Sequence, residues 1–573
     1  MYSPSHRNIK TVILYILIAL FAYSISRAMF KIMEEGTLGS ILRHLLPTTP
    51  YLLLIVIVSL YNIRRFSFSS LVPAIPSNLT LNVIFKRFFL ICLLAVLSGI
   101  CLHFYGGWLG LVYGSICLYI IVGYVYALVI STKKPLYGFL VLLLLYPFIS
   151  FIEYDFEKYS IISPLELGPI FLRFSIVAFF IFYVHILFLN SIKNKRRIHT
   201  ALDLPIYFFA AFLLLSCLVS PNIIVSLRNF YFAVICLVPL YYIVVNNIED
   251  TKDIKSLLVI TIMSYSMLIF ISYYFVWRGT DDISSKSTLF YGMLQTATFS
   301  HGQTGAVAVL TLPLLFAIYL SFSRSKKYVI AFVAMFILLC VIFSYTRSYI
   351  VVSILSMPYF MKIKGARKIM FILGLVLVLL AIMKTVFFEK YVFPRFTIWN
   401  SFEVFLEDQR PRIDGIQAAL KMIRDYPFMG VGPGMWEEYI PLYGKYVYTY
   451  RLPNGGYQIG YITFAHNFLL DYGAQAGVLT MGSLIWLFVI IIRKMIYINK
   501  KSRGTNDFPI AVGLSVSFSV FVLCGFIGGI YFYHYTGFLG VGILFWIITS
   551  SIIAMERVLK KQQVINNLPG KRG

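Results

Sequence analysis

Long apolar runs alternate with short connectors along this chain, and one long polar segment interrupts the pattern. The apolar runs are roughly 17 to 25 residues long, and each could cross a hydrocarbon layer of about 30 Å. They do not alternate in polarity at every second residue, so they predict membrane helices rather than barrel strands. Sixteen spans are predicted, at 11–30, 47–63, 88–105, 107–131, 135–152, 169–190, 203–219, 224–246, 255–276, 303–322, 328–345, 347–363, 369–387, 467–492, 509–529 and 535–554.

The predicted fold is an all-α, polytopic helical membrane protein with about sixteen transmembrane helices and one long extracytoplasmic loop. The predicted parts are N-terminal transmembrane helices (1–134), the first part of a transmembrane core (135–388), the long loop (389–465), C-terminal transmembrane helices (466–555) and a basic cytoplasmic tail (556–573). The tail is expected to be coil after Glu556.

Within the loop, apolar residues at helical spacing predict a short helix over Ile413–Arg424, lying along the membrane surface or packed over the bundle. Pro427 is expected to end this helix, and a G-x-G-x-G sequence follows at 430–434. Such glycines let the backbone approach a ligand or another helix closely. As a phosphate-binding motif, this pattern on its own is weak.

Composition and charge agree with a membrane protein. Apolar residues make up 60% of the chain, and the mean hydropathy is +0.83. The net charge of +26 comes from short connectors such as Lys193–Arg197 and Arg493–Arg503. Short Lys- and Arg-rich loops mark the cytoplasmic side, which places both termini in the cytoplasm and residues 389–465 outside. That loop holds eight acidic and eight basic residues, so no nucleic-acid partner is expected.

The sequence offers little for metals or disulfides. All seven cysteines lie within or at the edge of apolar runs, and none has C-x-x-C spacing, which favours a packing role. The outer loop has no Asp-x-Asp or His/Asp cluster of the kind that binds Mg²⁺ or Zn²⁺. We therefore expect neither a metal nor a cofactor.

Several polar residues are predicted to face the same outer side of the membrane: Arg228, His301, Arg347, Arg410, Arg412, His466 and Asn467. Guanidinium groups can clamp phosphate oxygens in a bidentate manner, and imidazole can accept a proton near neutral pH. Together they would suit a site that grips a diphosphate and deprotonates a hydroxyl. Each also has a structural alternative, because interfacial Arg side chains snorkel to lipid headgroups and interfacial His side chains form structural hydrogen bonds.

Four stretches of the chain resemble the O-antigen ligase and Wzy-type polymerase superfamily. They are F-S-H-G-Q-T-G (299–305), S-Y-T-R-S (344–348), Arg412 followed by A-L-K-M-I-R-D-Y-P-F-M-G-V-G-P-G (419–434), and H-N-F-L-L-D-Y-G-A-Q-A-G-V-L (466–479). The resemblance covers residues 200–555. The family implies a core of twelve helices, which would begin at about residue 135 here, with about four more helices before it.

This resemblance implies a glycosyltransferase of the bacterial cytoplasmic (inner) membrane. Such enzymes transfer a glycan from undecaprenyl diphosphate to an acceptor sugar, without a metal and outside the membrane. By position, Arg347 and Arg412 match the residues that bind the donor diphosphate, and His466 matches the catalytic base. Arg410, His301, Arg228 and Asn467 are possible auxiliary residues. Asp471 and Gln475 depart from the family pattern after His-Asn, which puts the acceptor contacts in question.

The sequence leaves two questions of function open. The acceptor is either a lipid A–core sugar, which would make the protein a ligase, or a lipid-linked repeat unit, which would make it a polymerase; the chain length favours the polymerase slightly. A transporter, either a polysaccharide flippase or a small-anion carrier, is the alternative from another class. A transporter should place ionisable residues at mid-membrane, and few are found there in this chain.

Overall fold

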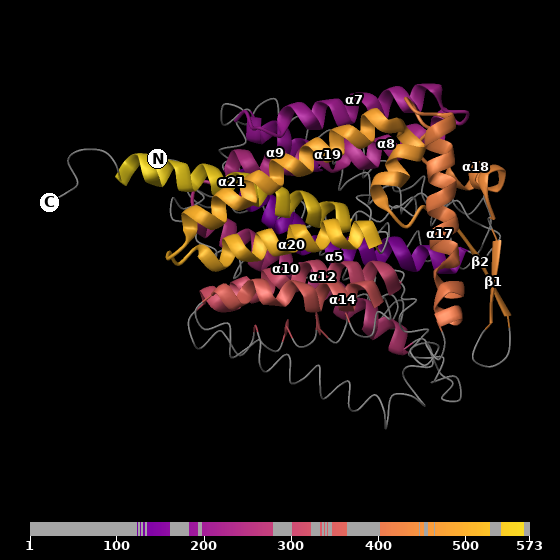
Figure 1. Ribbon diagram of the computed structural model, residues 1–573. Helices are drawn as coiled ribbons and strands as arrows, with labels where there is room; N and C mark the ends of the chain where they lie inside the picture. Colours follow the sequence, from indigo (N-terminus) through magenta and orange to yellow (C-terminus); the bar gives the residue numbers. More distant parts are fainter. Residues whose placement is uncertain are drawn as a thin grey trace, which may run out of the picture. The chain divides into compact units, whose positions relative to one another are not determined.

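A computed structural model describes residues 134–160, 183–192, 198–278, 301–322, 347–363, 402–445, 447–451, 457–462, 464–527 and 540–566, with isolated positions at 123–131 and 330–341. These residues are predominantly helical, as Figure 1 shows. The spans expected at 11–30, 47–63, 88–105 and 369–387 lie outside the described residues, and those at 107–131, 169–190 and 328–345 are only partly described.

The elements are α5 (Pro135–Ser160), α7 (Asp203–Val219), α8 (Ile223–Phe230), the π-helix η3 (Tyr231–Cys236), α9 (Val238–Asn247), α10 (Thr251–Arg278), α12 (His301–Ser321), α14 (Arg347–Ser356), the 3₁₀-helix η4 (Met357–Lys362), α17 (Phe402–Asp425), α18 (Trp436–Tyr443), β1 (Val447–Arg451), β2 (Tyr457–Tyr461), α19 (Phe468–Ser502), α20 (Phe508–Ile527) and α21 (Gly540–Asn566). The strands β1 and β2 form an antiparallel hairpin, which an all-α prediction did not include.

Two compact units divide the chain, residues 1–190 and residues 191–573. In the first unit, the amide of Asn190 donates a hydrogen bond to the Ser131 hydroxyl (3.1 Å). The helix α5 begins at Pro135, as predicted, but continues to Ser160. It therefore continues beyond the end of the span predicted at 135–152. All of the site described below lies in the second unit.

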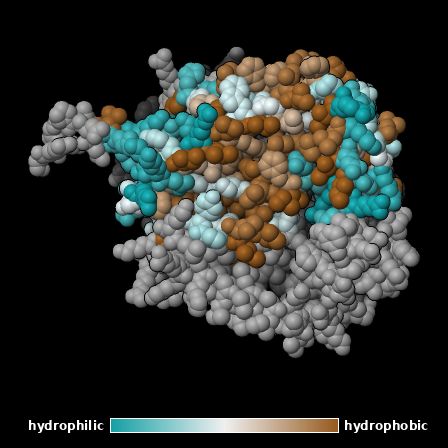
Figure 2. All heavy atoms as spheres, viewed as in Figure 1, coloured by the Kyte–Doolittle hydropathy of each residue, from teal (hydrophilic) through white to brown (hydrophobic). Residues whose placement is uncertain are grey.

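Four helices in the described part of the second unit are long and apolar enough to cross a membrane. They cover Ile223–Asn247, where α8, η3 and α9 run on continuously, Phe468–Ser502, Phe508–Ile527 and Gly540–Val564. Figure 2 shows a band of hydrophobic residues across the middle of one face, with hydrophilic residues gathered at both ends. Large apolar side chains such as Leu218 and Ile496 are more than half exposed, which suits contact with lipid. An integral helical membrane protein is thus supported, and the number of sixteen spans stays a prediction.

Close packing fixes the position of α19, the helix that follows His466. Its first residue, Phe468, is fully buried and makes ring contacts with Phe488, Phe521 and Phe526. A Cβ atom added at Gly525 of α20 would lie 2.5 Å from the Phe468 ring, so only glycine allows this approach. The start of α19 is therefore held firmly against the end of α20.

The polar segment between the membrane helices forms a small folded layer. The helix α17 lies across the ends of the bundle helices in Figure 1, and α18 and the hairpin lie on its far side. Buried apolar side chains from α17, α18 and the neighbouring loops form one cluster: Ala418, Ala419, Met422, Val431, Met435, Trp436, Ile440, Ile462, Ala465 and Ala474. The Trp436 indole N–H donates to the Ile462 carbonyl (2.9 Å). This cluster fixes the layer that carries Arg412.

The predicted loop helix exists, but its boundaries differ from the prediction and its apolar face is only partly buried. It runs from Phe402 to Asp425 rather than from Ile413 to Arg424. Of the apolar residues on which the prediction rested, Ala419 is buried and Ile423 packs against the buried cluster, but Ile413 and Leu420 are about half exposed at 44% and 51%. Gly415 faces inward instead, where an added Cβ would lie 3.2 Å from the Phe464 carbonyl. Close helix contact needs small residues, so the predicted apolar face is only partly the buried one, and small residues such as Gly415 complete the contact.

The coil predicted after Glu556 is wrong, because α21 continues to Asn566. Glu556 is buried and forms ion pairs with Lys494 (2.8 Å) and Lys560 (2.7 Å). Arg557 donates to the carbonyls of Val245 and Ile248 at the end of α9. These contacts extend the helix beyond the apolar run, and no hydropathy pattern could reveal them.

Candidate functional site

His466 occupies the residue position just before the N-cap of α19, in a strained backbone conformation. Its φ angle is +54°, the sole positive value at a non-glycine residue in the described part of the chain. Asn467 caps the helix, because its side-chain oxygen accepts the Leu470 N–H (3.2 Å). A non-glycine residue with positive φ costs about 1–3 kcal/mol and is enriched at functional sites. Such a residue at the mouth of a membrane helix therefore calls for a functional explanation.

The His466 side chain is partly exposed, but its Nδ1 atom is buried. Its ring packs against the Phe464 ring with 4.4 Å between centroids. The Nδ1 atom is buried and finds no hydrogen-bond partner among the described residues. Burial lowers the pKa of His466 to about 3, and the positive charge of Arg412 contributes to this lowering. The ring is therefore neutral at physiological pH, but with so low a pKa it is a weak base until its surroundings change.

Arg412 projects from the middle of α17, where it interacts with two other elements. Its guanidinium donates to the Gln409 side chain one helical turn earlier (3.1 Å). It acts electrostatically on His466 before α19 and on Tyr349 in the first turn of α14. The guanidinium of Arg412 therefore lies near enough to His466 to lower the pKa of the imidazole.

The other predicted residues have more varied positions. Arg347 is the first residue of α14, two positions before Tyr349, so its backbone lies at the same end of the bundle as Arg412. His301 begins α12. Arg410 is exposed on α17. Arg228 is exposed on α8, a helix that contacts the glycine-rich turn through Ser226 rather than through the arginine.

The glycine-rich turn (residues 427–435) packs into a break in α19, and its amides are used there. Gly477 has non-helical angles (φ 83°, ψ 168°) that interrupt the helix. Across this break, the Val431 N–H donates to the Ala474 carbonyl (3.0 Å), the Gly432 N–H to the Gln475 carbonyl (2.8 Å) and the Val478 N–H to the Pro427 carbonyl (2.7 Å). Of the two alternatives for this motif, close approach to another helix is confirmed. These amides are not free to cradle a phosphate.

Two serines in the membrane helices also hold this turn. The Ser216 hydroxyl of α7 donates to the Met429 carbonyl (2.5 Å), and the Ser226 hydroxyl of α8 donates to the Pro433 carbonyl (2.8 Å). Both serines are fully buried. The sequence analysis missed them, because an isolated serine in an apolar helix carries no pattern.

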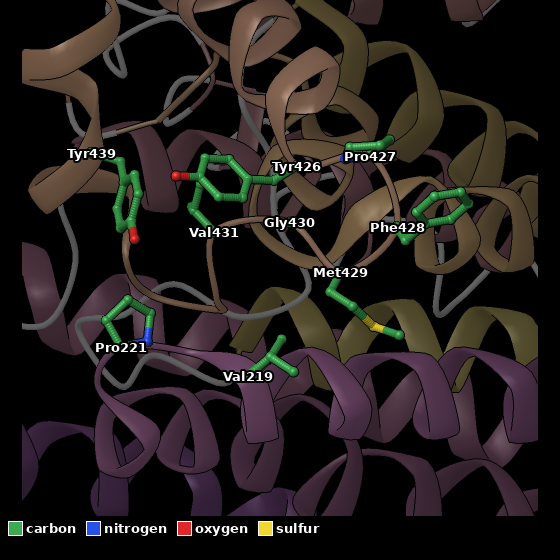
Figure 3. A pocket seen from close by; sticks show the side chains of 9 residues that line it. All are labelled: Val219, Pro221, Tyr426, Pro427, Phe428, Met429, Gly430, Val431 and Tyr439. Atoms are coloured by element: carbon green, nitrogen blue, oxygen red, sulfur yellow. The ribbon is translucent and has the colours of Figure 1, made fainter.

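An open cavity of about 350 Å³ lies on one side of the glycine-rich turn (Figure 3). Its lining comes from the end of α7, the following loop, the turn itself and α18: Val219, Pro221, Tyr426, Pro427, Phe428, Met429, Gly430, Val431 and Tyr439. No charged side chain is among these residues. A diphosphate would find no counter-charge there, so the cavity is separate from the Arg412–His466 site.

The described residues contain no group of three or more His, Cys, Asp or Glu side chains that could hold a metal ion. Within them, the site instead combines a guanidinium, a neutral imidazole and a buried helix start. This set combines a positive charge that can bind an anion with an imidazole that is neutral at physiological pH.

Comparison with known proteins gives a family match. A family model described as O-antigen ligase matches residues 306–487. The matched stretch includes Arg347, Arg412 and His466 and both ends of the contact between the glycine-rich turn and α19. The resemblance to the O-antigen ligase and polymerase superfamily is thereby confirmed. A search of curated proteins found no match to the chain.

Proposed function

We propose that this protein is a membrane glycosyltransferase that moves a glycan from undecaprenyl diphosphate to an acceptor sugar. The observation that carries this proposal is the electrostatic effect of Arg412, on α17, on the imidazole of His466, which precedes α19. The family match over residues 306–487 supports an O-antigen ligase or polymerase type of activity. The hydrophilic residues at the ends of the apolar band suit a site at the membrane surface.

In the proposed reaction, the neutral imidazole of His466 accepts the proton of an acceptor hydroxyl. The hydroxyl oxygen attacks the anomeric carbon of the donor as the bond to the diphosphate oxygen breaks. Arg412 and Arg347 stabilise the negative charge that collects on the departing diphosphate. A single displacement of this kind inverts the anomeric configuration. It requires no covalent intermediate and no metal.

Donor binding should also strengthen the base. Part of the low pKa of His466 is due to the positive charge of Arg412. A diphosphate bound to Arg412 would neutralise that charge and raise the pKa of the imidazole. Because a base works best when its pKa lies near the operating pH, the base would become effective only when the donor is in place.

The proposed acceptor is a glycan, either the lipid A–core or a second lipid-linked repeat unit. The glycan profile of a deletion strain separates these possibilities. A single repeat attached to core would identify a polymerase, whereas unligated polymer on its lipid carrier would identify a ligase. The proposed location is the inner membrane, with both termini cytoplasmic and the site facing outward.

The direct test is glycan transfer from a lipid-linked donor by the purified full-length protein. We expect His466→Ala and Arg412→Ala each to lower kcat by about 10²-fold or more. Arg424→Ala is the matched control, since Arg424 is exposed at the far end of α17 and pairs with Asp425 (2.9 Å). Full activity in both His466→Ala and Arg412→Ala would refute the proposed site.

A further inference from the structure

Asp471 lies fully enclosed in the first turn of α19, and each of its oxygens has its own partner. The residue is 7% exposed. Its Oδ1 accepts the Ala465 N–H (3.2 Å), and its Oδ2 accepts the Gln475 amide Nε2–H (2.7 Å). A buried carboxylate is costly unless it is hydrogen-bonded. This carboxylate bonds to the N–H of Ala465, the residue just before His466. Its presence there needs a reason beyond helix packing.

Gln475 continues the chain of hydrogen bonds to the glycine-rich turn. Its Oε1 accepts the Gly434 N–H (2.6 Å). The side chain therefore faces an N–H with its oxygen and a carboxylate with its nitrogen, and the reverse orientation would satisfy neither contact. One continuous path thus runs from Gly434 through Gln475 and Asp471 to Ala465, the residue before His466.

We infer that Asp471 and Gln475 are positioning residues that hold His466 in its strained conformation and tie it to the glycine-rich turn. This inference rests on the proposed role of His466 as the base. The strained backbone supports it, because a φ of +54° persists only where the surroundings impose it. The Ala465 N–H bond to Asp471 fixes the peptide group that precedes the one entering His466. The departure from the family pattern at Asp471 and Gln475 thus has a structural purpose.

The direction of each hydrogen bond along this path, from donor to acceptor, predicts the effects of single and double substitutions. Both partners of Asp471 are donors, the Ala465 N–H and the Gln475 NH₂ group. In Asp471→Asn, the new NH₂ group must face one of them, so two donors oppose each other. Gln475→Glu places two carboxylates opposite each other. In the double variant D471N/Q475E, the new amide at position 471 would accept from Ala465 with its oxygen and donate to the new carboxylate at position 475. That carboxylate would also accept the Gly434 N–H. Each single change breaks the path, and the double change restores it with reversed polarity.

The kinetic test compares wild type, D471N, Q475E and D471N/Q475E in the glycan transfer assay. Displacement of a catalytic group by about 1 Å can cost about 10²-fold. We therefore expect each single variant to lose about ten- to hundred-fold in kcat, with a smaller change in the KM for the donor, because Arg412 is untouched. The double variant should recover most of that loss. A purely structural role would lower thermal stability without this pattern in kcat.

Wild-type kcat in both single variants, or a double variant no better than the singles, would overturn the inference. If a single variant fails to fold, the double variant decides alone, since near-wild-type kcat after both changes supports the path and its loss refutes it. Loss of activity in His466→Ala, together with unchanged activity in the single variants, would leave the proposed function standing and remove only this inference.

Amide hydrogen exchange tests the path independently of activity. In the purified protein, Gln475→Glu should speed exchange in the peptide covering 462–467, although residue 475 does not touch it. Asp471→Asn should likewise speed exchange at 430–436, and the double variant should protect both segments again. Unchanged exchange at the distant segment in both single variants would show that the two ends are not coupled. This result is informative even if the wild-type protein transfers no glycan.

Discussion

The guanidinium of Arg412 on α17 and the imidazole of His466 before α19 are electrostatic neighbours. Arg412 lies in the middle of α17 and His466 follows the polar layer, and the buried cluster around Trp436 and Ile462 includes residues of α17 and Ala465. A cation beside an imidazole keeps the ring neutral, and the pair offers an anion site next to a proton acceptor. The effect of Arg412 on the pKa of His466 can therefore be tested by mutation and by titration.

The first prediction concerns the effect of Arg412 on His466. Arg412→Gln should raise the pKa of His466, because it removes the positive charge that disfavours the imidazolium. Arg412→Lys, the matched control, keeps the charge and should leave the pKa low. The pKa can be measured by NMR of protein with ¹³C-labelled histidine, with His466→Asn used to assign the signal. An unchanged pKa in Arg412→Gln would show that the two side chains are not neighbours.

The second prediction concerns stability in acid. The pKa of His466 is about 3 in the folded protein, against about 6.5 in an unfolded chain. The unfolded state therefore binds the proton more readily. The stability that depends on a neutral His466 is fully present above pH 6.5 and is lost as the pH falls toward 3. Wild type should thus lose thermal stability between pH 6.5 and 4.

His466→Asn should lose less stability over the same pH range. Asparagine tolerates a positive φ and does not titrate, so it fits this backbone without the penalty. Melting temperatures in detergent at pH 4, 5, 6 and 8 would measure the effect, with the pH 8 value of each protein as its own reference. Parallel acid slopes for the two proteins would contradict the assignment of a low pKa to His466.

Sequence patterns identified most of the helices because a membrane imposes length and hydropathy. The helix over Asp203–Val219 has the predicted limits, and α20 begins one residue from its predicted start. Patterns failed where tertiary contacts decide. The helical extension after Glu556 depends on ion pairs with Lys494 and Lys560, which no local pattern encodes.

The sequence predicted which residues form the candidate site, but not which residues hold them in place. The family motifs pointed to Arg412 and His466, and in the structure the charge of Arg412 lowers the pKa of His466. The use of the G-x-G-x-G amides could not be decided from sequence, because the same glycines suit a phosphate or a neighbouring helix. Only the position of the break at Gly477 decides between them. Ser216 and Ser226, which hold the turn, became visible only when the helices were packed.

The third prediction tests the break in α19. Gly477 has φ +83°, and an added Cβ would lie 1.9 Å from the Phe428 carbonyl oxygen. Gly477→Ala should therefore destabilise the protein by more than about 3 kcal/mol or prevent folding, because backbone cannot give way cheaply. Gly482→Ala is the matched control on the same helix, where nothing lies within 4 Å of the added Cβ. It should stabilise the protein by about 0.5–1 kcal/mol.

Thermal melting in detergent and yield after purification would compare the two glycine variants. Equal stability of Gly477→Ala and Gly482→Ala would mean that the turn does not insert into the helix as described. Loss in Gly477→Ala alone would confirm that the insertion is tight.

The fourth prediction concerns metal ions. The proposed reaction relies on guanidinium groups for charge stabilisation, so we expect EDTA to leave glycan transfer unchanged. Added Mg²⁺ or Mn²⁺ should not raise the rate of protein already treated with EDTA. A rate that falls with EDTA and returns with one divalent cation would require a metal in the mechanism.

The fifth prediction concerns the side of the membrane on which the site lies. The end of the bundle opposite α17 carries Lys494, Lys500, Lys501 and Lys560, and basic residues favour the cytoplasmic side. In a cysteine-free background, Glu437→Cys on α18 should react with a membrane-impermeant maleimide added outside spheroplasts. Lys501→Cys should react only after the membrane is opened. Both side chains are exposed in the structure, so a difference in labelling reports the side and not burial. Labelling of Lys501→Cys alone in intact spheroplasts would place Arg412 and His466 in the cytoplasm, where an outward-facing glycan transfer could not take place.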